Sequence, residues 1–241
     1  MTSIFIPTKN RLDKPKTYQI LKDLGLKPIL VLEPQEEQEA KKLGFNYIAL
    51  PLNDQGLTYS RNYILDYCRN NNIVNAVMID DDVNCFGRII EKRFIKDNKA
   101  FLDALKIFEK TQTCGTMEYA QFGWASPKSM SINKSIEVVH FLYIPKMKNV
   151  SYEYDTKEDK DLAIQLIFKG VDIFKCNHLC FQVPSIGTNK GGLHELYAQN
   201  RDNKWAENLY NKWGSNIVKL VKKKNGRIDV QIRWNKIRNE L

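Results

Sequence analysis

The stretch at residues 75–85, "NAVMIDDDVNC", decides the fold and places the first candidate site. Its opening letters, "NAVMID", form an apolar run that predicts a buried strand. Three consecutive carboxylates, Asp80, Asp81 and Asp82, stand where that strand ends. Like charges in a row repel one another, and carboxylates at the end of a buried strand are costly to desolvate. We therefore expect a positively charged partner at this edge of the sheet.

The chain before this stretch alternates between strand and helix patterns. We expect strands at 3–7, 27–33, 46–52 and 75–80, with helices between them at 14–25, 34–44 and 57–71. Alternation at this spacing predicts βαβ units and a mainly parallel sheet with right-handed crossovers. Ligands of such sheets bind beyond the carboxyl ends of the strands, where the three aspartates and the segments 7–11 and 51–56 fall.

The second half of the chain predicts a different arrangement. We expect a helix at 99–110, strands at 114–126 and 135–145 joined by a polar loop, a helix at 154–170, a strand at 171–183, a flexible loop at 187–192 and a hairpin turn at Asn225-Gly226. The fold class is therefore α/β: a mixed, mainly parallel sheet flanked by helices, with a basic C-terminal elaboration of hairpin and helix. The simplest organisation is one domain over 1–241, with a ligand-binding half (1–85), a second half (86–200) and the elaboration (201–241).

Composition and charge bound the function. The 241 residues are 43% hydrophobic and 27% charged, which is ordinary for a globular protein. No apolar run is long enough for a membrane span, the N-terminus does not read as a signal peptide, and five scattered cysteines suit a reducing compartment, so we expect a cytoplasmic protein. The net charge is +9, and residues 201–241 hold eleven Lys/Arg against four Asp/Glu. That basic end predicts a polyanionic partner or a solvated lysine-rich surface, and charge alone does not separate the two.

The aspartates form a D-x-D pattern. Asp80 and Asp82 point to the same side if the strand geometry continues, and Asp81 points away. Carboxylate oxygens are hard ligands suited to Mg²⁺ or Mn²⁺. The alternative is a solvated loop with Asx turns.

The longer stretch at 59–83, "YSRNYILDYCRNNNIVNAVMIDDDV", resembles the GT-A fold glycosyltransferases, in which a helix carrying Arg-Asn precedes the strand that ends in D-x-D. Arg61 and Asn62 match that pair. The resemblance implies a nucleotide-sugar donor and a metal ion held by Asp80 and Asp82, with Asp81 beside the donor. Arg61, near a helix N-terminus, would neutralise the diphosphate.

The opening "IFIPTKNR" resembles the first strand of the same fold, whose following loop holds the nucleotide base and ribose. The residues implied there are Pro7, Thr8, Asn10 and Arg11.

The segment "YEYDTKEDKDLAIQLIFKG" resembles the Glu-Asp pair that opens a helix in this fold and faces the acceptor. Glu158 and Asp159 match, and the resemblance implies that one of them, Asp159 in our interpretation, is the base that deprotonates the acceptor hydroxyl. A purely structural alternative is a capping box between Thr156 and Asp159. The two interpretations are compatible.

His178, in "FKCNHLCFQV", matches the metal-binding histidine of many GT-A enzymes. A half-buried histidine without that role is an equal alternative. A zinc site with Cys176 and Cys180 is disfavoured, because same-face neighbours on a strand lie about 6.6–7 Å apart, too far for ligands of one zinc. His194 is a weaker candidate.

More closely, the order of "IFIPTKNR", "GLTYSRN", "MIDDDV", "EDKDLA" and "NKGGL" resembles the TET/JBP-associated glycosyltransferases of bacteriophages. The resemblance implies transfer of a sugar from a UDP-sugar, with Mn²⁺ or Mg²⁺, to 5-hydroxymethylcytosine in double-stranded DNA. The C-terminal cations are candidates for phosphate contacts: Lys222, Lys223, Lys224, Arg227 and Arg233. Trp205, Trp213 and Trp234 are expected in the core rather than at a flipped base.

Three alternatives remain open at this point. A GT-A glycosyltransferase with a glycan or protein acceptor would carry the same core motifs, although the basic end argues against it. A nucleotidyltransferase also builds a D-x-D site, but "PTKNRLDKPK" lacks the glycine-rich phosphate loop. A DNA-binding module without catalysis would have little use for intact carboxylates at both candidate positions.

Overall fold

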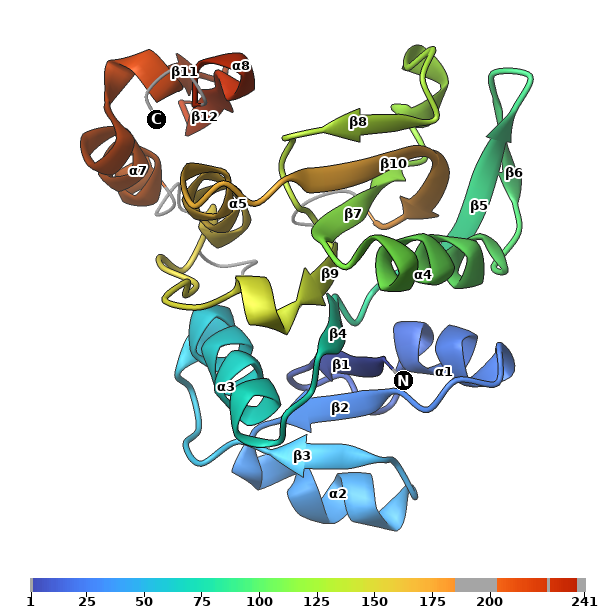
Figure 1. Cartoon of the computed structure of the whole chain (residues 1–241). Coiled ribbons are helices and arrows are strands. Elements are labelled where there is room, and N and C mark those ends of the chain that lie inside the picture. Colours follow the sequence, from blue (N-terminus) through green and yellow to red (C-terminus); the bar gives the residue numbers. More distant parts are fainter. Residues whose placement is uncertain (1, 185–202, 225, 238–241) are drawn as a thin grey trace.

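The computed structural model describes residues 2–184, 203–224 and 226–237, and a mixed sheet of ten strands forms its centre (Figure 1). The strand order is β3-β2-β1-β4-β9-β7-β10-β5-β6, with β8 paired to β10 off this path. The strands are β1 (Ser3–Pro7), β2 (Ile29–Leu32), β3 (Tyr47–Ala49), β4 (Asn75–Ile79), β5 (Cys85–Ile90), β6 (Arg93–Lys96), β7 (Cys114–Tyr119), β8 (Met130–Ile132), β9 (Val139–Tyr143) and β10 (Ile173–Gln182). β1–β4 pair in parallel, and β9 then joins β4 in the antiparallel direction, which confirms the predicted α/β class.

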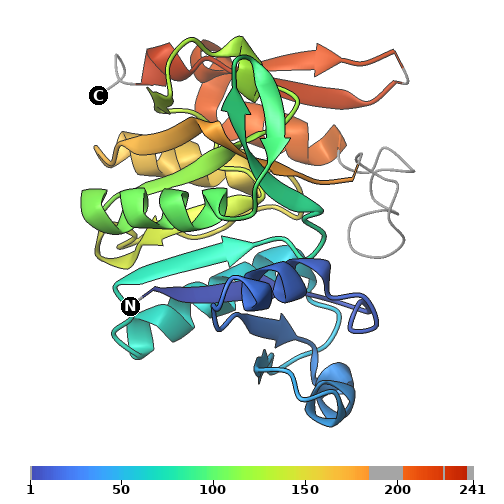
Figure 2. The same ribbon diagram turned by 90° about the vertical axis from the view of Figure 1, so that its right-hand side faces the viewer.

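Helices cover both faces of the sheet (Figures 1 and 2). The helices are α1 (Lys16–Asp23), α2 (Glu37–Lys42), α3 (Gly56–Asn70), α4 (Ala100–Thr111), α5 (Glu158–Phe168), α7 (Asn203–Ile217) and α8 (Trp234–Ile237), with short 3₁₀ turns η1 (Pro34–Glu36), η2 (Gly123–Ala125) and η3 (Ile144–Lys146). α1, α2 and α4 pack on one face and α3, α5 and α7 on the other. Successive side chains of a strand alternate between these two cores: Phe5 faces one, while Ile4 and Ile6 face the other.

The sequence did not predict the β5–β6 hairpin. Its turn consists of Glu91 and Lys92, which take left-handed conformations (φ 49° and 62°) that usually favour glycine or asparagine. Because the segment offers neither residue, it gave no turn signal. The sequence also did not predict β8. This strand lies in the stretch expected to be a polar loop, and it pairs with β10.

Two local predictions in the second half are wrong. Thr156 does not cap α5, because the cap position falls on Lys157 in the left-handed region (φ 66°) and no side chain bonds the helix end. The Thr156 hydroxyl oxygen is instead buried without a hydrogen-bond partner. In β10, the register with β7 shifts between Cys176 and Cys180, so a bulge breaks the expected same-face alternation around His178.

The C-terminal elaboration is part of the core. The hairpin of β11 (Val218–Lys222) and β12 (Ile228–Ile232) forms around the predicted turn, and Val230 and Ile232 are buried. Trp234 starts α8, and its ring packs on the core, as predicted. Asp161 on α5 is fully buried and accepts hydrogen bonds from Lys212 (2.9 Å) and Trp213 (2.6 Å) of α7. The elaboration therefore supports the central fold.

Within the described residues, none of the helices has the length and apolar character that a membrane span requires. The loop predicted at 187–192 and His194 lie outside the described residues.

Candidate active site at the end of strand β4

Asp81 anchors the loop after β1 to the end of β4. Its Oδ2 accepts a hydrogen bond from the Thr8 hydroxyl (2.8 Å), and its Oδ1 pairs with Arg11. Arg11 also lies 3.7 Å from Asp82. The loop predicted to bind a base and ribose is thus fixed against the D-x-D segment, since neighbouring parallel strands end at the same edge of the sheet. The base-binding role of Pro7, Thr8, Asn10 and Arg11 stays a prediction.

Acidic side chains of the first half shape the same loop. Asn10 has a left-handed backbone (φ 56°), and its N–H donates to Glu36 (2.8 Å). Lys9 pairs with Glu33 (2.9 Å) and also with Asp54. These contacts bring the predicted strand-end segment around 51–56 to the loop after β1.

Arg61 joins the strand end to α5. Only 3% of its side chain is exposed; one guanidinium nitrogen lies 2.9 Å from Asp80, and another pairs with Glu158. The guanidinium also lies 5.4 Å from the centre of the Tyr152 ring. The sequence placed Arg61 near a helix N-terminus as a phosphate ligand, but the structure places it inside α3 with two carboxylate partners. Phosphate binding by Arg61 stays a prediction. The structure shows that Arg61 connects Asp80 to Glu158.

Burial controls the ionisation of this cluster. It raises the pKa of Asp80 to about 6, with the charge of Arg61 acting in the opposite direction and those of Asp82 and Asp81 adding to the rise. Burial likewise raises the pKa of Glu158, against the effect of Arg61. One guanidinium between the partly exposed Asp80 and the buried Glu158 cannot fully compensate both charges.

The donor set fits a divalent cation. Asp80 and Asp82 keep 33% and 28% of their side-chain surface exposed, whereas Asp81 keeps 11% and turns into the protein. Four carboxylates (Asp80–Asp82 and Glu158) meet two guanidinium groups (Arg11 and Arg61), so the cluster has a charge of −2 when all four carboxylates are ionised. Within the described part of the chain, no group of three or more His, Cys, Asp or Glu side chains is positioned to hold a metal ion. Two carboxylates suffice for Mg²⁺, which takes its other ligands from water and substrate phosphates.

His178 lies in the β10 bulge, and its Nε2 donates to the Ser126 carbonyl (2.9 Å). This hydrogen bond holds the segment after η2 against β10. The metal-binding role of His178 stays a prediction. The neighbouring cysteines are buried and free, and burial raises the pKa of the Cys176 and Cys180 thiols to about 12.

Asp159 opens α5 beside Glu158, and its Oδ1 accepts a hydrogen bond from the Lys160 N–H (2.7 Å). Asp159 is only partly buried, whereas Glu158 is buried and paired with Arg61. Of the two predicted catalytic carboxylates, Asp159 is therefore the one accessible to an acceptor. Its role as the base stays a prediction.

Sequence reasoning missed Glu137. Burial raises the pKa of this carboxyl, and the charge of Asp159 acts in the same direction, so the two groups lie within electrostatic reach. The following residue, Val138, has a left-handed backbone (φ 59°), and its carbonyl accepts the Asp80 N–H (3.1 Å). A β-branched residue rarely takes this conformation, and such backbone strain clusters at functional sites. In the sequence, the available signal for Glu137 was its position as a single carboxylate directly before the apolar run "VVHFLY".

Asn62, the second residue of the Arg-Asn pair, clamps α3 to the segment before α5. Its side chain donates to the Tyr152 carbonyl (2.9 Å) and accepts from the Tyr152 N–H (2.8 Å). The Tyr152 hydroxyl lies 2.9 Å from Nδ1 of the buried His140, whose pKa burial lowers well below its ordinary value. His140 and Tyr152 therefore form a neutral hydrogen-bonded pair, and the guanidinium of Arg61 lies over the Tyr152 ring.

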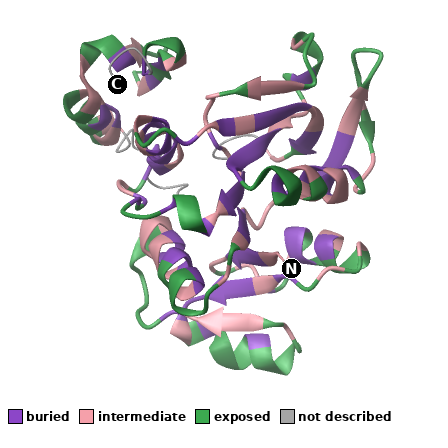
Figure 3. Cartoon of the chain, in the orientation of Figure 1, coloured by how far each residue is buried: buried purple, intermediate pink, exposed green. Residues whose placement is uncertain are grey.

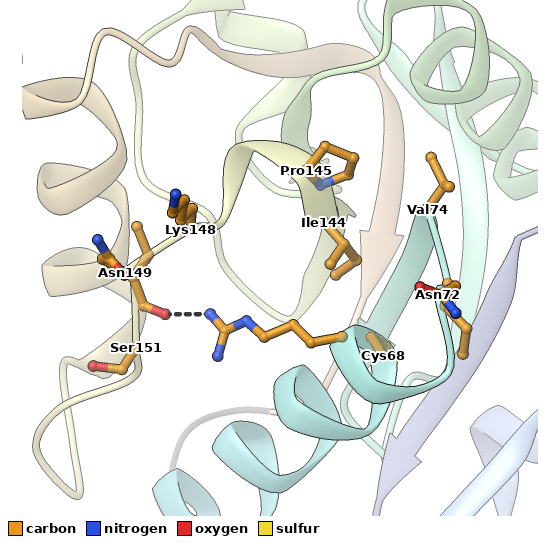
Figure 4. A pocket seen from close by; sticks show the side chains of 11 residues that line it. Cys68, Asn72, Val74, Ile144, Pro145, Lys148, Asn149 and Ser151 are labelled. Carbon is orange, nitrogen blue, oxygen red and sulfur yellow. Dashed lines mark hydrogen bonds between the residues drawn. The ribbon is translucent and has the colours of Figure 1, made fainter.

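A cavity of about 780 Å³ lies at the other end of α3 and β4 (Figure 4). Its lining includes Cys68, Val74, Ile144 and Lys148, and Arg69 donates to the Met147 and Val150 carbonyls beside it (2.8 Å each). Because Val74 precedes β4 and the aspartates follow it, this cavity is separate from the acidic site.

The central sheet with a carboxylate cluster at the carboxyl end of β4 defines an α/β protein of the Rossmann-like GT-A class. The chain belongs to the TET-associated glycosyltransferase family, whose model matches residues 2–192. It is therefore a glycosyltransferase. No curated protein matches it.

Several solved structures are similar to this chain at low identity. The CMP:2-keto-3-deoxy-manno-octonic acid synthetase complexed with CTP is 12% identical, covers 82% of this chain and 98% of its own, and has a TM-score of 0.45. The mannose-1-phosphate geranyltransferase from Thermus thermophilus is 11% identical, with 75% of each chain covered and a TM-score of 0.47. The UDP-glucose pyrophosphorylase complexed with UDP-glucose is 12% identical, covers 73% of this chain and 90% of its own, and has a TM-score of 0.43. At this level of identity the likeness concerns the fold alone.

The raised pKa of Glu158 gives a pH dependence of stability. The folded state holds the Glu158 proton to a higher pH than the unfolded chain does, so its contribution to the free energy of unfolding is present at low pH and lost as the pH rises. We expect the stability of the wild type, relative to Glu158→Gln, to fall between about pH 4.5 and 7. Urea unfolding across this range measures it. The exposed Glu39→Gln serves as control; a wild-type profile parallel to that of Glu158→Gln would contradict the assignment.

Proposed function

We propose that the protein transfers a sugar from a UDP-sugar to the 5-hydroxymethyl group of 5-hydroxymethylcytosine in double-stranded DNA, with Mn²⁺ or Mg²⁺. The observation that carries the proposal is the acidic end of β4, where Asp80 and Asp82 are partly exposed, beside the loop after β1. Family membership supports sugar transfer, and the net charge of +9 supports a polyanionic acceptor.

In this proposal the residues divide between donor and acceptor. Asp80 and Asp82 would hold the metal ion, and water and the phosphates of the donor would complete its ligand set. When bound, that ion would stabilise the negative charge on the diphosphate leaving group. The Pro7–Arg11 loop, held in place through Asp81, would bind the nucleoside. Asp159 would take the proton of the acceptor hydroxyl as its oxygen attacks the anomeric carbon of the sugar.

Arg61 has a positioning part in this scheme. Because it contacts both Asp80 and Glu158, it fixes the distance between the donor side of the site and the first turn of α5. Asp159 is the next residue after Glu158, so the same link orients the proposed base.

The test is mass spectrometry of nucleosides from 5-hydroxymethylcytosine DNA incubated with the protein, Mn²⁺ and a panel of UDP-sugars. A hexose or pentose mass shift on 5-hydroxymethyl-2′-deoxycytidine establishes the reaction, donor and acceptor together. Hydrolysis of a UDP-sugar without a mass shift would support the proposed donor and refute the DNA acceptor. That outcome would favour a glycan or protein acceptor. Neither shift nor hydrolysis would refute the proposed donor as well.

Asp159→Asn should lower the turnover of sugar transfer about 10²–10⁴-fold, the usual contribution of a general base. Donor affinity should stay within a few-fold, because Asp159 is placed on the acceptor side. Single-turnover rates and UDP-sugar titration measure the two quantities. Glu153→Gln, on the segment before α5, is the matched control and should retain turnover. A collapse of donor affinity in Asp159→Asn would remove Asp159 from the base role.

A further inference from the structure

The β5–β6 hairpin projects from the edge of the sheet (Figure 1). β10 pairs with β5 only from Cys85 to Arg88, so the outer part of the hairpin extends past that pairing. β6 is the last strand of the sheet and pairs with β5. Figure 3 shows exposed residues at its tip. A free two-stranded ribbon of this kind has the dimensions that the major groove of B-DNA admits.

Positive charge gathers on this ribbon. Residues 85–99 hold five Lys/Arg against two Asp/Glu. Arg88 is paired with Asp97 and Asp103 (2.6 Å each), so it supports the base of the ribbon. Lys92, Arg93 and Lys96 are exposed around its outer part. These three side chains complement a phosphate backbone.

A loop carrying two exposed aromatic rings lies against the same ribbon. Phe122 and Trp124 keep 54% and 56% of their surface exposed, which is unusual for rings of this size. Gly123 between them packs so closely that a Cβ there would lie 2.7 Å from Ile89 of β5. The exposed Lys128 follows in the same loop, and residues 121–134 contain no acidic residue.

The loop is held firmly, although its rings are exposed. The buried Asn177 donates to the Ser126 hydroxyl and to the Lys128 carbonyl (2.9 Å each), and His178 donates to the Ser126 carbonyl. The Trp124 indole N–H is satisfied by the Gln121 carbonyl (2.9 Å). The rings are therefore displayed in a fixed orientation, with little ordering entropy left to lose on binding.

From these observations we infer that the ribbon surface, defined as Lys92, Arg93, Lys96, Phe122, Trp124 and Lys128, is where duplex DNA docks. This inference rests on the proposed function, whose acceptor is DNA. The cations contact phosphates on either side of a groove, and the two rings contact bases or the sugar edge. β5 begins three residues after Asp82, so the ribbon starts at the acidic site. From Cys85 to Ile90 the strand β5 extends roughly 17 Å at 3.3 Å per residue. That length corresponds to about 5 base pairs of B-DNA.

The test compares charge removal at two surfaces of the full chain. Lys92→Gln/Arg93→Gln/Lys96→Gln removes three charges from the ribbon surface, and Lys222→Gln/Lys223→Gln/Lys224→Gln removes three from the C-terminal hairpin. Binding of a labelled duplex of about 20 base pairs with one 5-hydroxymethylcytosine is measured by anisotropy between about 50 and 200 mM KCl. We expect the ribbon variant to lose at least about tenfold in affinity at the lowest salt and its salt slope to fall by up to about 3. The C-terminal variant tests the phosphate contacts that the sequence predicts for Lys222, Lys223 and Lys224, and it should lose less affinity than the ribbon variant.

The aromatic rings are tested separately. Trp124→Ala should weaken duplex binding about tenfold without changing the salt slope, because stacking or wedging does not release counterions. Leu43→Ala, an exposed apolar residue on the C-cap of α2, is the matched control. UDP-glucose hydrolysis without DNA should be unchanged in every variant, which reports an intact donor side and a folded protein.

The outcomes separate this inference from the proposed function. If the wild type glycosylates DNA but the ribbon and Trp124 variants bind it normally, or only the C-terminal variant weakens, the docking surface is wrong and the function stands. If the wild type hydrolyses UDP-glucose yet neither binds nor modifies DNA, the proposed acceptor fails and this inference with it. If Trp124→Ala changes the sedimentation of the protein and leaves DNA binding intact, the surface joins two copies of this chain and the inference is overturned.

Discussion

Asp82→Ala should give a folded protein whose sugar transfer falls at least about a thousandfold. The proposed ion would contribute several kcal/mol of transition-state stabilisation, and each 1.36 kcal/mol is about a factor of ten in rate. Asp82 keeps 28% of its side chain exposed and lies after β4 rather than in the core, so its removal should leave the fold intact. The loss should appear in turnover and in Mn²⁺ affinity together.

The measurement is initial transfer rate against Mn²⁺ concentration, with thermal unfolding as the test of folding. Asp66→Ala is the matched control, since Asp66 is an identical side chain that is 66% exposed on α3, where it pairs with the nearby Arg69. The control should transfer sugar at the wild-type rate. Transfer at that rate by Asp82→Ala itself would refute the metal assignment.

Arg61→Met should lower the free energy of unfolding by about 3–5 kcal/mol, the usual cost of breaking a buried ion pair from one side. The change leaves Glu158 buried without its guanidinium and Asp80 without its 2.9 Å partner. Methionine keeps much of the volume, so the loss reports charge rather than a cavity. Urea unfolding at about pH 8, where Glu158 is more fully ionised, should show the largest effect.

The double variant Arg61→Met/Glu158→Met provides the control. Removing both charges of a buried pair is often close to neutral, so the double variant should recover most of the stability lost by Arg61→Met alone. A double variant as unstable as the single one would show that Arg61 acts through packing on Tyr152 rather than through charge.

Local patterns accounted for the N-terminal half of the fold. β1 has the predicted bounds, and α3 and β4 differ from their predictions by a residue or two at their ends. The apolar run before Asp80 located the strand, and the end of that strand located the acidic cluster. The strand geometry does not continue through the aspartates, because β4 ends at Ile79 and Asp81 and Asp82 lie in a turn; the lower exposure of Asp81 comes instead from its contacts with Thr8 and Arg11.

Non-local contacts account for what the sequence did not predict. Arg61 is buried because α5, about a hundred residues later, brings Glu158 against it. Glu137 reaches Asp159 through a tight turn at Val138 that no residue preference indicates. The β5–β6 hairpin uses non-glycine residues in left-handed conformations, so its turn was invisible to residue statistics.

The packing of α7 on α5 sets a rule for building chimeras. The family model ends at residue 192, yet two of the donors to the fully buried Asp161 carboxylate, Lys212 and Trp213, lie after that point. A fragment cut at the family boundary would leave this carboxylate with Gln165 of its own helix and without the charge of Lys212, and a buried carboxylate without a cationic partner is costly. Any exchange of α5 between this chain and a relative should therefore transplant α5 together with α7 as one unit.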